Sequence, residues 1–261
     1  MKLDNQQYYD NYNWEKAKLD VRLTEKINIL FNSIPSDVRN VCDIGCGDGA
    51  ITNKLREHFK VVASDRSFNA LKFVETEKFC SSAEKLPLKN HSFDQVFSSE
   101  MIEHLPDDIF RNTINEFKRI SKKYIYLTFP NDENVQKNFV KCPNCNFVFN
   151  KIYHLRNLNL EKIEKLFPEY EIIFQTTHGK PTKKYNKLLA KLKHALVPPK
   201  SWIPMRWTPE KRRSTMCPEC SHSFEITYEF NLLGFLIDSL NEIISPRIPY
   251  QQFVLLKKRN A

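Results

Sequence analysis

VCDIGCGDGA, residues 41–50, is a short apolar run that passes through three glycines into a helix-like segment. Glycine is needed where a backbone turns sharply and where a ligand comes within contact distance of the main chain, as at Gly45 and Gly47. With Ala50 as a further small residue, the string also satisfies the loose dinucleotide fingerprint, and Asp65 follows after ~20 residues, as a ribose-binding acid does. These residues predict a nucleotide-binding turn without choosing the cofactor.

Asp43 indicates which kind of cofactor the turn would bind. It lies two residues before the first glycine, where a carboxylate would repel the pyrophosphate of NAD but would suit a cofactor that carries an ammonium and a sulfonium. S-adenosylmethionine is such a cofactor. Two structural alternatives stay open: Asp43 could tie the loop together through backbone N–H groups, and Asp65 could cap the next helix.

Short apolar runs alternate with amphipathic segments on both sides of this turn, which is typical of βαβ units around a parallel sheet. The predicted strands are 40–44, 60–64, 78–82, 94–99, 124–129, 170–177 and 250–257. The predicted helices are 15–33, 50–58, 67–76, 107–121, 159–167 and 230–244. We therefore expect an α/β, Rossmann-like, mostly parallel sheet with helices on both faces.

Composition limits the class of protein. The chain has 261 residues, of which 41% are hydrophobic and 27% charged, a balance typical of a soluble globular protein. The beginning of the chain lacks an export signal, and no apolar run approaches the ~18 residues of a membrane span. We expect a cytoplasmic protein, with peripheral membrane association as an open possibility.

The stretch 38–130 resembles the class I S-adenosylmethionine-dependent methyltransferases, in particular the branch of quinone-biosynthesis and small-molecule O-methyltransferases. The resemblance rests on DIGCGDG, Asp65, SSAEKLPLKNHSFDQVFSSEMIEHL and YIYLTFPN. It implies that Gly45 and Gly47 approach the methionine moiety and that Asp65 binds the ribose hydroxyls. The full set of cofactor-binding residues that it implies is Asp43, Gly45, Gly47, Asp65, Arg66, Ala83, Glu84 and Ser99. Ala83 and Glu84 would lie beside the adenine, and Ser82 stands where the family usually has an aspartate.

The segment after the fourth strand constrains the methyl acceptor. SSEMIEHLP, residues 98–106, lacks the Asn/Asp-Pro-Pro-aromatic stretch of enzymes that methylate base amines, and it lacks a Pro-Cys nucleophile. Hydroxyl acceptors usually need a base, and the candidate catalytic residues are His154 and His104. His104 could instead pack beneath the cofactor loop, His154 could bind a metal, and Arg156 could steer the substrate.

Two C-P-x-C strings, Cys142 to Cys145 and Cys217 to Cys220, have the spacing of zinc knuckles, although 71 residues separate them. Strands 124–129 and 170–177 are expected to run parallel, so the loops after both strands leave at the carboxyl edge of the sheet. Zn²⁺ could join these loops into one lid. Buried or disulfide-bonded cysteines are the alternative, and His154 or His222 could replace a cysteine.

The net charge of +9 is concentrated between residues 179 and 215, which hold eleven basic side chains and one acid, Glu210. Within this stretch, KKYNKLLAKLKHALV at 183–197 predicts a basic amphipathic helix. Its apolar positions are Tyr185, Leu188, Leu189, Leu192 and Leu196. Three interpretations stay open: leucines packed on the domain, a helix at an anionic membrane surface, and contacts to nucleic-acid phosphates.

The expected organisation has six parts. They are a helical cap (1–37), an S-adenosylmethionine-binding core (38–130), a first insertion with CPNC (131–158), a core continuation (159–178), a basic insertion with CPEC (179–228), and a helix with the final strand (229–261).

We expect an S-adenosylmethionine-dependent methyltransferase with a zinc-binding lid that O-methylates a small molecule or a lipid-linked saccharide. An RNA methyltransferase and a non-catalytic cofactor- or zinc-binding module are the alternatives. The sequence leaves the oligomeric state open.

Overall fold

The computed structural model describes residues 8–9, 12, 14–16 and 20–259. Its largest sheet contains β1 (Asn40–Ile44), β2 (Lys60–Asp65), β3 (Glu77–Cys80), β4 (Phe93–Ser99), β5 (Ser121–Pro130), β8 (Tyr170–Lys183) and β11 (Arg247–Lys258). Their order is β3-β2-β1-β4-β5-β11-β8. The first five strands are parallel, and β11 is antiparallel to both neighbours. The expected α/β fold with a mostly parallel sheet is confirmed.

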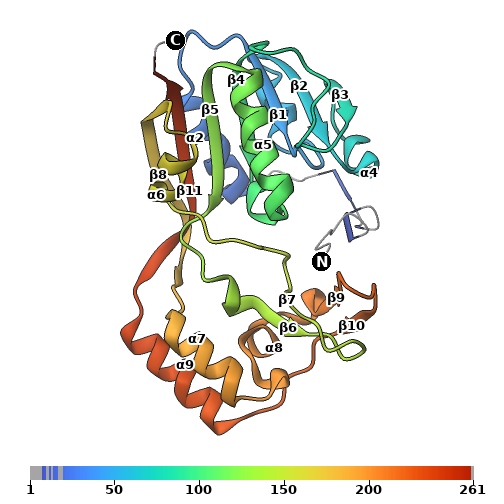
Figure 1. Cartoon of the computed structure of the whole chain (residues 1–261), viewed down its shortest axis with the longest axis vertical. Coiled ribbons are helices and arrows are strands. Elements are labelled where there is room, and N and C mark those ends of the chain that lie inside the picture. The colour runs from blue at the N-terminus through green and yellow to red at the C-terminus, as the bar shows by residue number, and fades with distance from the viewer. Residues whose placement is uncertain (1–7, 10–11, 13, 17–19, 260–261) are drawn as a thin grey trace.

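Helices cover both faces of this sheet (Figure 1). They are α2 (Val21–Ser33), α3 (Thr52–Leu55), α4 (Phe68–Leu71), the 3₁₀ turn η1 (Ile102–His104), α5 (Asp107–Ile120) and α6 (Leu160–Leu166). Phe117 of α5 and Ile163 of α6 are buried in one apolar cluster, and Leu30 of α2 is buried in the other. Because both faces are covered, β1 and β5 are buried along nearly their whole length.

The predicted strands all form, whereas two predicted helices are shorter. The segment 50–58 forms only α3, and 67–76 forms only α4, which begins after the side chain of Ser67 accepts a hydrogen bond from Ala70 N. The helix predicted at 15–33 is described from Val21 onward, and residues 17–19 lie outside the described part.

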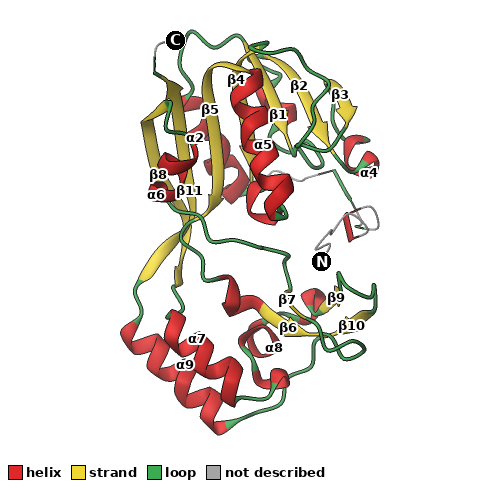
Figure 2. Ribbon diagram, viewed as in Figure 1, coloured by secondary structure: helices red, strands yellow, loops and turns green. Residues whose placement is uncertain are grey.

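β8 and β11 are longer than the other strands and leave the sheet together as a two-stranded ribbon (Figure 2). The pairing continues to Lys183 opposite Arg247, with a register shift between Pro249 and Gln251. This ribbon carries the second insertion away from the sheet, so the insertion is anchored by backbone hydrogen bonds rather than by a loose loop.

We use the name insertion lobe for residues 131–158 and 184–246, which lie together below the sheet in Figure 1. The lobe contains η2 (Val135–Asn138), β6 (Phe139–Lys141), β7 (Val148–Asn150), α7 (Lys187–Leu196), η3 (Pro199–Ser201), α8 (Ile203–Trp207), η4 (Glu210–Arg212), β9 (Ser214–Met216), β10 (Ser223–Glu225) and α9 (Leu232–Ile244). β6 pairs with β7, and β9 pairs with β10, as two separate hairpins.

The sequence-based boundary at residue 229 differs from the structure, because α9 belongs to the insertion lobe. Asp238 of α9 accepts hydrogen bonds from Tyr185 at 2.8 Å and from Lys193 at 2.5 Å. Ile237 is buried in the same small cluster as Leu189 of α7. α9 therefore packs on α7, and β11 is the part of 229–261 that returns to the sheet.

Candidate functional site

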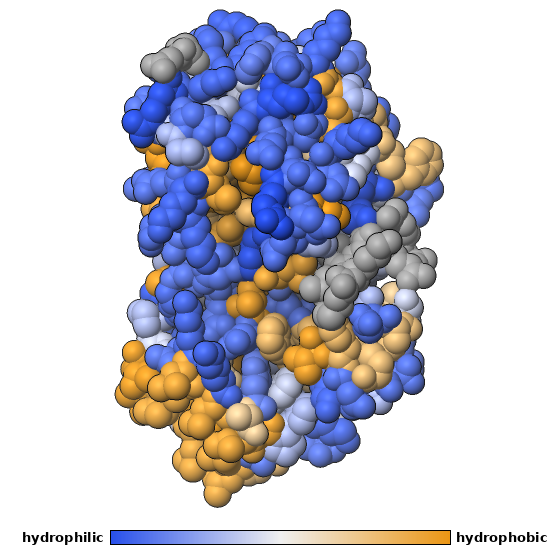
Figure 3. Space-filling model, viewed as in Figure 1, coloured by the Kyte–Doolittle hydropathy of each residue, from blue (hydrophilic) through white to orange (hydrophobic). Residues whose placement is uncertain are grey.

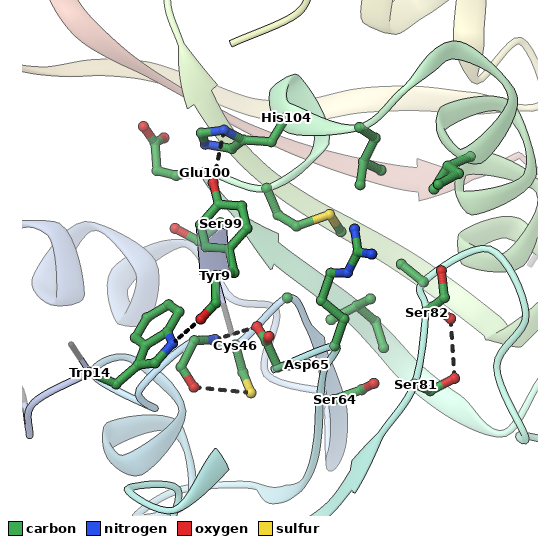
Figure 4. A pocket seen from close by; sticks show the side chains of 18 residues that line it. Tyr9, Trp14, Cys46, Ser64, Asp65, Ser81, Ser82, Ser99, Glu100 and His104 are labelled. Carbon is green, nitrogen blue, oxygen red and sulfur yellow. Dashed lines mark hydrogen bonds between the residues drawn. The ribbon is translucent and has the colours of Figure 1, made fainter. Parts of the chain in front are cut away.

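A cavity of about 240 Å³ lies at the carboxyl ends of β1, β2 and β4 (Figure 4). It is lined by Tyr9, Trp14, Ile44, Gly45, Cys46, Gly47, Ser64, Asp65, Arg66, Ser81, Ser82, Ala83, Ser99, Glu100, Met101, His104, Leu105 and Ile109. Ligands of open α/β sheets bind at this edge, beside the point where the strand order reverses. The cavity is therefore the candidate binding site.

The glycine-rich turn forms one wall of the cavity with its backbone. Gly45 and Gly47 have φ angles of +75° and +55°, which L side chains rarely adopt. A Cβ atom on Gly45 would also lie 2.3 Å from Cγ of Met101. Both the conformation and the close approach require glycine, so the turn presents main-chain atoms directly to a ligand.

Asp65 lies at the end of β2 and fixes the turn. Its two carboxylate oxygens accept hydrogen bonds from the N–H groups of Gly47 and Ser67, each at 2.8 Å. Burial raises the pKa of Asp65 above its ordinary value. Asp65 therefore organises the backbone of the turn, as one of the open alternatives expected. It also lines the cavity, and each of its oxygens can accept a further hydrogen bond.

Asp43 lies behind the turn rather than in the cavity wall. It is 2% exposed, and one carboxylate oxygen accepts a hydrogen bond from Thr52 Oγ1 at 2.6 Å. Its other oxygen, Oδ1, is buried without a partner among the described residues. Burial raises the pKa of Asp43 to about 7. A cationic ligand at the turn would favour the ionised form of this acid.

The structure brings most of the expected cofactor-binding residues to one cavity. Those that line it are Gly45, Gly47, Asp65, Arg66, Ala83 and Ser99. Asp43 and Glu84 lie outside the wall, and Glu84 accepts a hydrogen bond from Ser82 Oγ at 3.4 Å.

Two aromatic residues that the sequence pattern did not assign to the site cover the cavity. Trp14 lies 3.3 Å from the Cβ position of Gly47, and its indole N–H donates to the carbonyl of Tyr9 at 2.9 Å. The hydroxyl of Tyr9 lies 3.2 Å from Nδ1 of His104, as Figure 4 shows. The aromatic-rich beginning of the chain was the available signal, but it did not indicate which strand end these rings would reach.

Glu103, His104 and His154 form a group that we call the Glu-His-His cluster. One ligand atom from each lies within 4.8 Å of the others. Nε2 of His104 is 4.0 Å from a carboxylate oxygen of Glu103, and the two imidazole rings are 4.6 Å apart. The cluster forms because Leu155 N donates to the carbonyl of Glu103 at 2.8 Å, which ties the first insertion to the turn after β4.

The cluster contains a buried carboxyl group that accepts no hydrogen bond from the described residues. Glu103 is 1% exposed, and neither carboxylate oxygen has a hydrogen-bond partner among the described residues. Burial raises the pKa of Glu103, and burial together with the neighbouring His154 lowers the pKa of His104 to about 3. Burying a carboxyl group in such surroundings costs free energy unless a ligand or an ion supplies the missing partner.

His154 lies behind His104 rather than in the cavity wall. Its Nδ1 contacts the carboxylate of Glu133, which leaves Nε2 for the cluster. Histidines that bind metals commonly have a carboxylate on the other ring nitrogen in this way. Arg156, which was expected to steer a substrate, instead stacks 3.8 Å from the ring of Phe110 and pairs with Asp107 at 3.1 Å.

The four cysteines of the two C-P-x-C strings converge in the insertion lobe. Sγ of Cys142 is 3.7 Å from Sγ of Cys220, and Sγ of Cys145 is 3.6 Å from Sγ of Cys217. A tetrahedron with Zn–S bonds of ~2.3 Å has sulfur–sulfur edges of ~3.8 Å, close to these separations. The same separations are too long for disulfide bonds, and these cysteines are free thiols in the structure.

The two cysteine turns have the same backbone pattern. In the first, Cys142 N donates to Phe147 O at 2.9 Å and Asn146 N donates to Cys142 O at 3.0 Å. In the second, Cys217 N donates to His222 O and Ser221 N donates to Cys217 O, both at 2.9 Å. The residue after each second cysteine has a positive φ, 62° at Asn146 and 57° at Ser221. Each hairpin therefore offers two thiols in a matching geometry.

Comparisons with known proteins agree with this fold. Residues 42–127 match the family model described as a methyltransferase domain. An uncharacterized protein of Methanocaldococcus jannaschii is 36% identical over 84 residues, which are 31% of this chain and 36% of that protein. The chain thus spans about a third of the length of this curated relative.

Two solved structures share the fold over most of the chain. An S-adenosylmethionine-dependent methyltransferase from Archaeoglobus fulgidus has a TM-score of 0.52 at 17% identity, covering 90% of this chain and 94% of its own. The YcgJ protein of Bacillus subtilis has a TM-score of 0.53 at 14% identity, covering 91% and 100%. Residues 42–127 are therefore similar to a methyltransferase domain, and they lie within a Rossmann-like α/β fold.

Proposed function

We propose that the protein is an S-adenosylmethionine-dependent O-methyltransferase acting on a hydroxyl group of a small molecule or saccharide. The observation that carries the proposal is the lining of the cavity, which includes the glycine-rich turn and His104 of the Glu-His-His cluster. In the reaction, the acceptor oxygen attacks the sulfonium methyl group in line, the sulfur–carbon bond breaks, and S-adenosylhomocysteine leaves. The acceptor hydroxyl gives up its proton, and alignment of the two reactants supplies most of the rate.

The turn and the two acids account for cofactor binding. The backbone at Gly45 and Gly47 allows the methionine moiety to come close, and Asp65 offers lone pairs to the ribose hydroxyls. Asp43 adds a buried negative charge behind the turn, which attracts the sulfonium and the ammonium. The same charge disfavours the pyrophosphate of NAD.

The Glu-His-His cluster would hold a divalent cation. Two imidazoles and one carboxylate suit a transition metal, and the unpartnered buried oxygens of Glu103 are what such an ion would complete. When bound, the cation would lower the pKa of a coordinated acceptor hydroxyl. Glu133 orients His154, and Tyr9 contacts His104, so both rings are held in place. His104 is the member of the cluster in the cavity wall, so it is the candidate contact to the acceptor hydroxyl.

The four thiols would hold a structural Zn²⁺, because all four positions of a tetrahedron are filled by cysteine. That ion would join the two insertions, which chain connectivity alone leaves separate. Tyr153 then links the zinc site to the cluster, since its hydroxyl donates to Met216 O at 2.7 Å and it precedes His154. Through these contacts, the insertion lobe would be held in one position relative to the cavity.

The proposal is tested by measuring S-adenosylhomocysteine release with lipid-linked saccharides, polyphenols and RNA as separate acceptors. The assays are run after chelation and after adding back Mn²⁺, Co²⁺ or Mg²⁺. Saccharide or polyphenol turnover supports the proposal, and turnover restricted to RNA contradicts the acceptor class. Tight binding of NAD, or no binding of S-adenosylmethionine, contradicts the proposal as a whole.

Variants of the cluster give the sharper test. His154→Ala and Glu103→Gln should each lower turnover by ~10²–10⁴-fold while cofactor affinity stays unchanged. His58→Ala, at an exposed histidine outside the cavity, is the matched control. Unchanged turnover in both cluster variants would remove the cluster from the mechanism.

A further inference from the structure

α7 and α9 expose an apolar surface that no described part of the chain covers. Its side chains, which we call the α7–α9 face, are Leu188, Leu192 and Leu196 of α7 and Leu232, Leu233, Leu236, Leu240, Ile243 and Ile244 of α9. The exposed fraction reaches 73% at Leu188 and 80% at Ile243. Figure 3 shows hydrophobic side chains gathered over this end of the insertion lobe.

This face is separate from the contact between the two helices. The helices bury Leu189 and Ala190 of α7 with Ile237 of α9, which completes their shared core. The exposed leucines of α7 recur every four residues, so they form a stripe beside that core. The six exposed residues of α9 fall within an arc of about 120° at 3.6 residues per turn. The sequence-based interpretation in which all five apolar positions of 183–197 pack on the domain is therefore wrong for Leu188, Leu192 and Leu196.

The exposed charges beside the α7 part of the face are positive. Residues 180–200 contain seven lysines and no acidic residue. Lys187 and Lys191 are exposed on α7, next to its leucine stripe. Lys193 is the buried exception, where it pairs with Asp238 at 2.5 Å. The rim of the apolar face on α7 is consequently positive.

Aromatic side chains lie near the beginning of α9. Phe230 and Trp207 are each 67% exposed, and Arg206 stacks between Trp207 and Phe235 at 4.7 and 5.2 Å from the two rings. Exposed aromatic rings next to basic side chains are typical of protein surfaces that lie at the boundary between lipid headgroups and acyl chains.

We propose that the α7–α9 face lies on an anionic lipid surface, with its leucines among the acyl chains and its lysines among the headgroups. Helices of this kind insert by about 5–10 Å. None of the described helices has the length and hydropathy of a membrane span. A second copy of the chain fits less well, because a two-fold interface would bring the positive rims together. RNA fits less well because nine exposed aliphatic side chains have neither a positive charge nor a hydrogen-bond donor for phosphates.

The test is flotation of the whole protein with vesicles of phosphatidylcholine alone or mixed with phosphatidylglycerol. We expect the protein to float with the anionic vesicles, and Leu236→Glu combined with Leu240→Glu to weaken this by about tenfold or more. Val21→Glu combined with Phe68→Glu is the matched control, since it adds the same charge at exposed apolar residues of the core. Lys187→Gln with Lys191→Gln should weaken binding to anionic vesicles several-fold more than binding to neutral ones.

Three results would overturn the proposal. The first is no flotation with either vesicle. The second is a stable dimer in light scattering that Leu236→Glu with Leu240→Glu dissociates. The third is RNA binding that the lysine variant abolishes and the leucine variant leaves intact. Circular dichroism of each variant separates loss of binding from loss of the lobe. Vesicle binding is independent of turnover, so its failure would leave the proposed reaction untouched.

Discussion

The core and the insertion lobe are stabilised in different ways. The sheet buries two large apolar clusters, one on each face, and its central strands are almost wholly inaccessible to solvent. The lobe has two small clusters, one around Cys142 and Cys217 and one between α7 and α9. Its hairpins have three residues in each strand. Small apolar cores leave little net stability, and metal ions commonly supply the difference. We therefore expect the core to fold by burial alone, whereas the lobe would need a metal ion on its four cysteines.

The largest expected effect comes from removing a zinc ligand. Cys142→Ser should lose the metal and unfold both hairpins, because structural zinc contributes ~10–16 kcal/mol of binding free energy in small zinc modules. Hydrogen exchange should accelerate at 139–150 and 214–225 while β1 and β4 stay protected. Elemental analysis should give about one zinc per wild-type chain. Cys80→Ser, at an exposed thiol, is the control; a metal-free wild type with protected hairpins would contradict the idea.

Truncating a buried side chain of the core should destabilise the core rather than the insertion lobe. Phe117 is fully buried under the sheet, so Phe117→Ala should lower the free energy of unfolding of the core by ~3–5 kcal/mol. Trp202→Ala, at a residue 5% exposed between α7 and α9, should destabilise the lobe alone. Scanning calorimetry is expected to move a different transition in each variant. A single transition shifted equally by both would show that the two regions unfold as one unit.

Asp43→Asn should improve stability while it harms binding. The pKa of Asp43 is about 7 in the folded protein against 3.8 for the ordinary acid, so its favourable contribution is complete below pH 4 and disappears as pH rises through 7. At pH 8 without cofactor, the variant should be more stable than the wild type by up to ~4 kcal/mol, less at pH 4. Denaturant titration at the two pH values measures this. Equal stability differences at both would indicate that Asp43 does not titrate in this range.

The smallest effect concerns cofactor affinity. Asp65→Ala should weaken S-adenosylmethionine binding by ~1–3 kcal/mol, the scale of a hydrogen bond to a charged group. Calorimetry of the same binding by Cys142→Ser should give nearly the wild-type value, because the zinc ligands do not line the cavity. The reverse ranking would place cofactor recognition in the lobe rather than in the core.

The sequence predicted the core well because its signals are local. Strand and helix periodicities, the glycine-rich turn and the acid at the end of β2 can each be recognised from a short stretch of the chain. The two C-P-x-C strings also predicted that the four cysteines come together, because their internal spacing is typical of metal-binding turns.

Contacts between residues far apart in the sequence could not be predicted in the same way. Nothing near Glu103 indicates that His154 will complete its cluster, because the contact depends on how the first insertion folds back. The pattern of 230–244 predicted a helix but not the element that packs on it, because an apolar face can be covered by any apolar partner. The same limit left open whether the leucines of α7 are exposed, and it hid the position of Trp14 over Gly47.

The place of β11 in the sheet has a consequence for synthesis on the ribosome. β11 lies between β5 and β8, so β8 has no sheet partner until residues 247–258 have emerged. At ~5–20 residues per second, the interval from the end of β8 to the end of β11 is roughly 4–15 s. During that interval the first cysteine hairpin also waits for its counterpart. The nascent chain therefore exposes an open strand edge and unpaired thiols together, which makes this the stage at which a chaperone or an early supply of zinc would most improve yield.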